Sequence, residues 1–185
     1  MAIAVETLKT ERLVLKKIKE QNLGDYTEWK SQQEYHDFLP SSPKTDYKDT
    51  LNKIVKGYDN LEDPTLLWGI FLGDKLIGSV SIENWNTTHK WCELGWGLNP
   101  KYQHNGYAFE AVSCLINHIF NTLNMNRVSI VIWDGNNQSK HLAEKLGFVK
   151  EGVDRKARFK DGKYTDVLRF GLLKEEWEGR KVCKK

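Results

Sequence analysis

Apolar and polar residues alternate with two different periodicities along the chain. The periodicity of each segment predicts whether it is a helix or a strand. The longest regular stretch has apolar residues spaced by three and four, with polar residues on the opposite side. This spacing predicts an amphipathic helix that packs on a flat surface. Its apolar positions are Ala108, Ala111, Val112, Leu115, Ile116, Ile119 and Leu123.

Shorter apolar runs, rich in β-branched and aromatic residues, predict the strands. Gly73-Asp74 and Asp161-Gly162 interrupt two of these runs as turn signals, and Asn99-Pro100 ends another. Two hairpins are expected, over 67–84 and 158–173. The single strands expected are 12–18, 90–100, 127–133 and 148–153.

Three further helices are predicted over 24–39, 46–60 and 136–148, the last of which ends at Gly147. The order is β-α-α-β-β-β-α-β-α-β-β, with hairpins before a single β-α-β crossover. That order predicts an α/β fold, more specifically an α+β mixed sheet with helices on its faces. Since no internal repeat or low-complexity linker interrupts it, we expect one domain over 1–185.

Composition narrows the class of protein without naming a function. The 185 residues favour one domain, and 39% hydrophobic with 29% charged residues is typical of a soluble globular chain. The net charge of +3, from 28 basic and 25 acidic residues, is too balanced to indicate a nucleic acid partner. No apolar run approaches the roughly 18 residues of a membrane span, and the N-terminal stretch lacks the features of a signal peptide.

The three cysteines, Cys92, Cys114 and Cys183, lie far apart in the sequence. Their number is odd and no pair has the spacing of metal ligands, so we expect neither a disulfide framework nor a metal site. A reduced, cytoplasmic protein is the resulting expectation.

The stretch YQHNGYAFEA at 102–111 contains the strongest chemical signal. A polar turn with Gly106 leads into the long helix, and no Ser, Thr or Asp stands in the capping position. Free backbone N–H groups at a helix start favour an anion, most often a phosphate. Neither a P-loop nor a dinucleotide fingerprint is present, and by itself the turn is also compatible with a plain strand-to-helix connection.

The surrounding order of motifs resembles the GCN5-related N-acetyltransferases, the GNAT superfamily, and within it the RimJ/RimL type that includes ribosomal-protein N-acetyltransferases. The turn resembles the family's Q/R-x-x-G-x-G/A motif, and 10–18, 93–112, 136–152 and 166–177 resemble its other signatures in sequence order. The resemblance implies a central, mostly antiparallel sheet flanked by helices, with acetyl-CoA as co-substrate and no metal. It implies that the coenzyme diphosphate meets Gln103, His104, Asn105, Gly106, Tyr107 and Ala108.

The resemblance also implies roles at the end of the preceding strand and around the next helix. The backbone N–H of Leu98 would polarise the acetyl carbonyl, with Gly95 and Gly97 either permitting a bulge or making room for neighbouring side chains. Asn136 would bind the pantetheine arm and Ser139 would donate a proton to the thiolate. Both residues are also good helix caps.

Deprotonation of the amine needs a base when the acceptor is strongly basic. Glu93 is the first candidate because it lies in phase with the two strand glycines, and its alternative is a charged residue on an open sheet face. Weaker candidates are Glu83, His89 and Asp166, whereas Glu110 is interpreted as structural.

The acceptor itself is an amine, either a protein N-terminus or a small molecule such as a polyamine, an amino-acid-like metabolite or an antibiotic. A non-catalytic coenzyme A binding module is the alternative from another class. Aromatic residues that either line the acceptor pocket or pack in the core are Trp29, Tyr35, Trp68 and Trp85. The residues that either meet the coenzyme's 3′-phosphate or form a solvated helix face are Lys140, His141 and Lys145. The oligomeric state stays open, a homodimer included.

Overall fold

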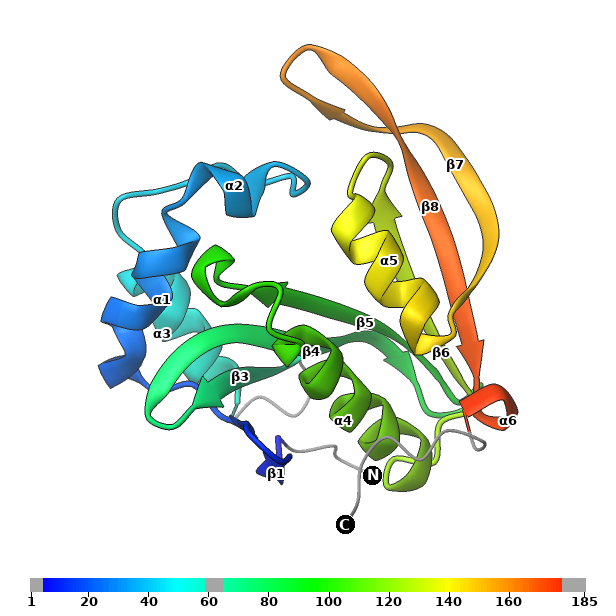
Figure 1. Ribbon diagram of the computed structural model, residues 1–185, viewed down its shortest axis with the longest axis horizontal. Coiled ribbons are helices and arrows are strands. Elements are labelled where there is room, and N and C mark those ends of the chain that lie inside the picture. The colour runs from blue at the N-terminus through cyan, green and yellow to red at the C-terminus, as the bar shows by residue number, and fades with distance from the viewer. Residues whose placement is uncertain (1–4, 59–64, 178–185) are drawn as a thin grey trace.

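A single eight-stranded sheet organises the residues that the computed structural model describes, 5–58 and 65–177 (Figure 1). The strand order is β1-β2-β3-β4-β5-β6-β8-β7, and every neighbouring pair is antiparallel except β5 with β6. The strands are β1 (Leu8–Lys9), β2 (Val14–Lys16), β3 (Leu66–Leu72), β4 (Lys75–Asn86), β5 (Trp91–Leu98), β6 (Arg127–Trp133), β7 (Val149–Lys160) and β8 (Lys163–Leu173). The predicted mixed, mostly antiparallel sheet is confirmed.

The helices lie on both faces of this sheet, as predicted. They are α1 (Leu23–Lys30), α2 (Gln33–His36), α3 (Lys48–Gly57), α4 (Tyr107–Asn121), α5 (Asn137–Leu146) and α6 (Lys174–Trp177). Two short 3-10 turns, Glu20–Asn22 and Pro100–Tyr102, precede α1 and follow β5. None of the described helices has the length and apolarity that crossing a bilayer requires.

The prediction of one continuous helix over 24–39 is wrong. Gln32 has extended backbone angles, φ −81° and ψ 133°, which separate α1 from α2. The physical reason is a competing set of hydrogen bonds. The carbonyl of Lys30 accepts from His36 Nε2 at 2.6 Å and from the Tyr47 hydroxyl, and both partners come from outside α1.

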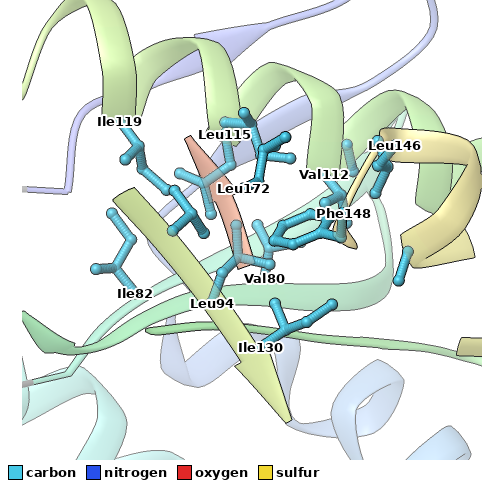
Figure 2. Close-up of a cluster of buried hydrophobic side chains, with 14 of the residues drawn as sticks. Val80, Ile82, Leu94, Val112, Leu115, Ile119, Ile130, Leu146, Phe148 and Leu172 are labelled. Carbon is cyan, nitrogen blue, oxygen red and sulfur yellow. The ribbon is translucent and has the colours of Figure 1, made fainter. Parts of the chain in front are cut away.

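Two apolar clusters hold the helices to the sheet. On one face α4 and α5 cover the strands, and the apolar stripe predicted for the long helix is buried there (Figure 2). Side chains that meet in this cluster include Val80, Ile82, Leu94, Val112, Leu115, Ile119, Ile130, Leu146, Phe148 and Leu172. On the other face α1 and α3 pack on β3 and β4 through Trp29, Tyr26, Leu51, Phe71 and Leu76.

The parallel pair β5 and β6 stays together for only three residues. Trp91–Glu93 pairs with Arg127–Ser129. Beyond these residues β5 continues to Leu98 and β6 to Trp133 without pairing with each other, although each stays paired with its other neighbour, β4 or β8. The two strands therefore diverge into a V within an otherwise continuous sheet. The V leaves backbone edges at the centre of the sheet, where strands are normally paired on both sides.

Candidate active site

A cavity of about 700 Å³ occupies the open end of the V. Four segments line it: the α2 region, the end of β5, the loop that leads into α4, and the first turns of α5 together with the residues before them. It therefore brings together the loop predicted to bind an anion and the strand end predicted to handle a carbonyl.

The N-terminus of α4 is built without a side-chain cap, as its sequence indicates. Gly106 is the N-cap residue, with φ 80° and ψ 0°, and no side chain caps the helix there. This left-handed conformation is easily adopted only by glycine. The side chain of Asn105 donates instead to the carbonyls of Tyr102 and Gln103 and holds the loop in shape. The first N–H groups of α4 are thus available at the cavity wall.

Arg12 supports this loop from behind, a role that the sequence alone did not reveal. Its guanidinium donates to Glu110 Oε2 at 2.7 Å and to the carbonyl of Asn105 at 3.1 Å, and lies 4.6 Å from the centre of the Tyr107 ring. Thr10 also donates to Glu110. Burial opposes ionisation of Glu110, but the hydrogen bonds from Thr10 and Arg12 prevail and lower its pKa. These contacts agree with the structural interpretation of Glu110.

The end of β5 directs backbone groups into the V. The N–H of Asn99 donates to the carbonyl of Ile77 at 2.8 Å, and the register places Gly97 opposite Ser79. Because hydrogen-bonding direction alternates along a strand, the N–H groups of Leu98 and Trp96 point away from β4. They therefore face the opening between β5 and β6.

Gly95 and Gly97 make room for neighbouring side chains. The register between β4 and β5 is regular from Glu93 to Leu98, so no bulge lies at either glycine. A Cβ atom on Gly97 would lie 2.5 Å from the hydroxyl of Tyr35, and one on Gly95 would lie 2.7 Å from Ser81 Oγ.

Asn136 and Ser139 both line the cavity. Asn136 Oδ1 accepts from the backbone N–H of Ser139 at 3.1 Å, so Asn136 is the N-cap of α5. Capping uses only the carbonyl oxygen of this amide, and the amino group is a separate donor. His141 and Lys145 line the same wall, and the ammonium of Lys145 lies 4.7 Å from the centre of the Phe109 ring.

The other candidates from the sequence lie away from the cavity. Glu93 is directly opposite Glu83 on β4 and accepts from Asn84 Nδ2 at 3.4 Å. Glu93 precedes Gly97 by four residues, which corresponds to about 13 Å along a strand. The role of Glu93 as the base stays a prediction. Asp166 accepts from the backbone N–H of Lys156.

Among the aromatic candidates, only Tyr35 lines the cavity. Trp29 and Trp68 are fully buried, which supports packing as their role. Tyr35 also has an unusual neighbour, since Lys30 Nζ donates to its hydroxyl at 2.8 Å. Lys30 was not a candidate from the sequence, because its contact with Tyr35 depends on the break between α1 and α2.

No group of three or more His, Cys, Asp or Glu side chains in the described residues is arranged to hold a metal ion. Cys92 and Cys114 are buried in the core, and Cys183 lies outside the described residues.

Comparison with known proteins decides the family. The family described as "Acetyltransferase (GNAT) domain" matches residues 12–149. The chain belongs to the GNAT acetyltransferases. The N-acetyltransferase p20 of Bacillus licheniformis, whose function is uncharacterised, is 31% identical over 178 residues, 95% of this chain and 100% of p20. YdaF of Bacillus subtilis is 32% identical over 113 residues, 61% of this chain and 62% of YdaF.

Solved structures agree with the family assignment. A GNAT acetyltransferase from Bacillus anthracis superposes with a TM-score of 0.81 at 25% identity, covering 92% of this chain and 100% of that chain. Within this GNAT fold, the V between β5 and β6 and the uncapped start of α4 are parts of one site. The expected GNAT fold is confirmed.

Proposed function

We propose that this GNAT enzyme transfers the acetyl group of acetyl-CoA to the N-terminal α-amine of a polypeptide. One observation carries the proposal: a single cavity connects the uncapped N-terminus of α4 with the open backbone edge of β5. An anion-binding element and a carbonyl-polarising element are thus placed side by side, which acyl transfer from a coenzyme thioester requires.

The loop and the start of α4 fit the diphosphate of the coenzyme. A helix N-terminus carries about half a positive charge and several free N–H groups, and both favour a phosphate. In the proposed complex the backbone from Gln103 to Ala108 surrounds the diphosphate, and Gly106 lets it approach without a side chain in the way. Arg12 keeps that loop in place through the carbonyl of Asn105.

The diverging strands fit the pantetheine arm and the thioester. We propose that the N–H of Leu98 donates to the acetyl carbonyl and stabilises negative charge on its oxygen during attack. The amino group of Asn136 would donate to the pantetheine arm, and Ser139 would give a proton to the departing thiolate. Asn136 and Ser139 line the same cavity from the start of α5.

The shape of the acceptor side favours an extended chain over a compact small molecule. A second hollow of about 280 Å³ lies between α2 and the β7–β8 hairpin, and it shares Asp37 and Phe38 with the main cavity. The first residues of a peptide could follow this path away from the reacting amine. The ribosomal-protein-serine acetyltransferase of Escherichia coli is 33% identical over 104 residues, 58% of that protein. A cytoplasmic location is part of the proposal.

A polyamine acceptor is the second candidate, and a specific observation favours it. Three carboxylates, Asp37, Asp134 and Asp161, line the second hollow together with Lys160 and Lys163, and the carboxylates could bind the distal ammonium groups of a polyamine. The spermidine N(1)-acetyltransferase of Vibrio cholerae is 30% identical over 105 residues, 61% of that protein.

A panel of acceptors tests the proposal by the release of free coenzyme A thiol. We expect peptides with a free N-terminal serine or alanine to be acetylated with a higher kcat/KM than spermidine or spermine. Matched peptides with a blocked N-terminus and an internal lysine are the control and should give no turnover. Preference for spermidine would assign the polyamine function. Binding of acetyl-CoA without thiol release for any acceptor would indicate a coenzyme A binding module.

A further inference from the structure

Lys30 lies in an aromatic cage behind the wall of the cavity. Its ammonium is 4.3 Å from the centre of the Tyr35 ring, 4.8 Å from that of Trp29 and 5.5 Å from that of Tyr26. Among the described residues no carboxylate forms an ion pair with it. An amine in such surroundings is unlike the solvated or ion-paired lysines elsewhere on the surface.

Tyr35 connects this amine to the cavity. Its hydroxyl accepts from Lys30 Nζ at 2.8 Å, and the same hydroxyl lies against Gly97 on the cavity wall. Gly97 precedes Leu98, whose N–H faces the opening of the V. The Tyr35 hydroxyl therefore lies between the end of β5 and the amine of Lys30.

The environment of Lys30 suits a group that changes its protonation state near neutral pH. Burial removes water from the ammonium and lowers the pKa of Lys30 to about 8. Burial also raises the pKa of Tyr35 above its usual range, so its hydroxyl keeps a proton. The ring faces can stabilise the ammonium once it has formed.

Among the described titratable groups near Lys30, those other than Tyr35 form no hydrogen bond with its amine, which donates to the Tyr35 hydroxyl. His36 and the Tyr47 hydroxyl hydrogen-bond to the backbone carbonyl of Lys30, not to its amine. Tyr26 meets the ammonium with its ring face. The nearest acidic residue on α1, Glu28, is engaged by Lys75 and Lys101.

We propose that Tyr35 and Lys30 form the proton relay of the acetyl transfer. As the amine nitrogen bonds to the acetyl carbon, its N–H bond breaks and that proton passes to the Tyr35 oxygen. The original Tyr35 proton passes to the lone pair of neutral Lys30, which becomes an ammonium. Tyr35 is thus the catalytic residue, and Lys30 acts through it. Lys30 as a whole residue is not fully buried, and in the proposed relay its amine returns the proton to solvent between turnovers.

This relay deepens the proposed function and rests on it, and it replaces Glu93 as the proton acceptor. A lysine whose pKa burial has brought near the working pH is well matched to general-base chemistry. The step needs no co-reactant beyond the acceptor and acetyl-CoA, since the thiolate takes its own proton separately.

The decisive variants are Lys30→Arg, Lys30→Met and Tyr35→Phe, with Lys17→Met as matched control. Lys17 also lies against a ring, 5.1 Å from the centre of Tyr58, but Tyr58 does not line the cavity. Because Lys30 holds the α1–α2 connection through its backbone carbonyl, the side-chain variants should fold, which acetyl-CoA affinity and melting temperature verify. We expect all three to lower kcat by about 10² to 10⁴, with affinity for acetyl-CoA unchanged.

Lys30→Arg separates a relay from a fixed positive charge. A guanidinium keeps its proton at all accessible pH values, so a relay fails with arginine whereas a structural cation is rescued by it. Wild-type kcat at saturating acceptor should rise as the pH passes through about 8. The pH midpoint of kcat should be the same for two peptide acceptors whose α-amines differ in pKa. The Lys17→Met control should have the same midpoint as the wild type.

Three kinetic results would overturn the relay. They are wild-type kcat in Lys30→Arg, a loss smaller than about threefold in Tyr35→Phe, or a large loss in Glu93→Gln that erases the acidic limb of the pH profile. NMR titration of ¹³C-labelled lysine side chains gives a readout independent of turnover. A resonance that titrates below the usual lysine range and is absent from Lys30→Met supports the relay, and its absence from the wild type refutes it. Failure of the acceptor panel would instead refute the proposed function.

Discussion

Replacing Gly97 by alanine should push the Tyr35 ring out of the cavity wall. An added Cβ would lie 2.5 Å from the Tyr35 hydroxyl oxygen, 2.9 Å from Cε2 and 3.1 Å from Cζ, where ordinary contacts begin at 3.4 Å. Restoring that contact requires the ring to move by about 1 Å. The movement would also change the 2.8 Å hydrogen bond with Lys30.

The expected loss has a kinetic part and a stability part. A displacement of about 1 Å at a reacting group can lower the rate by about 10². Overpacking should reduce the free energy of unfolding by about 1–3 kcal/mol, because the Tyr35 ring packs edge-on against Trp29 with centres 4.7 Å apart. Acetyl-CoA affinity should change little, since the loop at Gly106 is a separate segment.

The assay combines kcat from thiol release with unfolding in denaturant. Gly152→Ala is the matched control, because a Cβ there would meet no atom within 4 Å. A double-mutant cycle gives the sharper measurement. In a Tyr35→Ala background the overlap is gone, so Gly97→Ala should no longer destabilise the fold. Equal destabilisation in both backgrounds would refute the contact between Gly97 and Tyr35 as the cause.

Two further predictions concern the coenzyme loop and the anchoring of α1. Gly106→Val should weaken acetyl-CoA binding by at least about tenfold, because Gly106 has φ 80° and valine disfavours that conformation. Unchanged affinity by calorimetry in the folded variant would contradict the loop assignment. Hydrogen bonds from Lys75 and Lys101 lower the pKa of Glu28 from its usual 4.5 to about 2. Its stabilisation, about 1 kcal/mol for ion pairs of this exposure, is therefore complete above pH 4.5 and lost as the pH falls toward 2. Wild type and Glu28→Gln should accordingly differ in melting temperature at pH 7 and converge in acid. A difference that stays constant would show that the carboxylate's charge is not responsible.

The elements that depend mainly on local residue spacing could be predicted from the sequence. The three-and-four periodicity located α4, because one face of a helix must be apolar to pack on a sheet. Gly73-Asp74 and Asp161-Gly162 located two hairpins, both of which the structure contains. The glycine-containing turn before α4 indicated an uncapped helix start, and the ordered motifs indicated the GNAT family.

The way in which these elements form one site became visible only in the folded protein. The V arises because β5 and β6 pair over three residues and then diverge, a matter of strand geometry that no local pattern records. The break between α1 and α2 depends on Tyr47, seventeen residues after the carbonyl that it binds. Arg12 reaches the loop before α4 across 93 positions. Tyr35 reaches Gly97 only because the chain turns back over the sheet after that break. Contacts between residues so far apart in sequence are fixed by packing of the whole domain, and local propensities do not encode them.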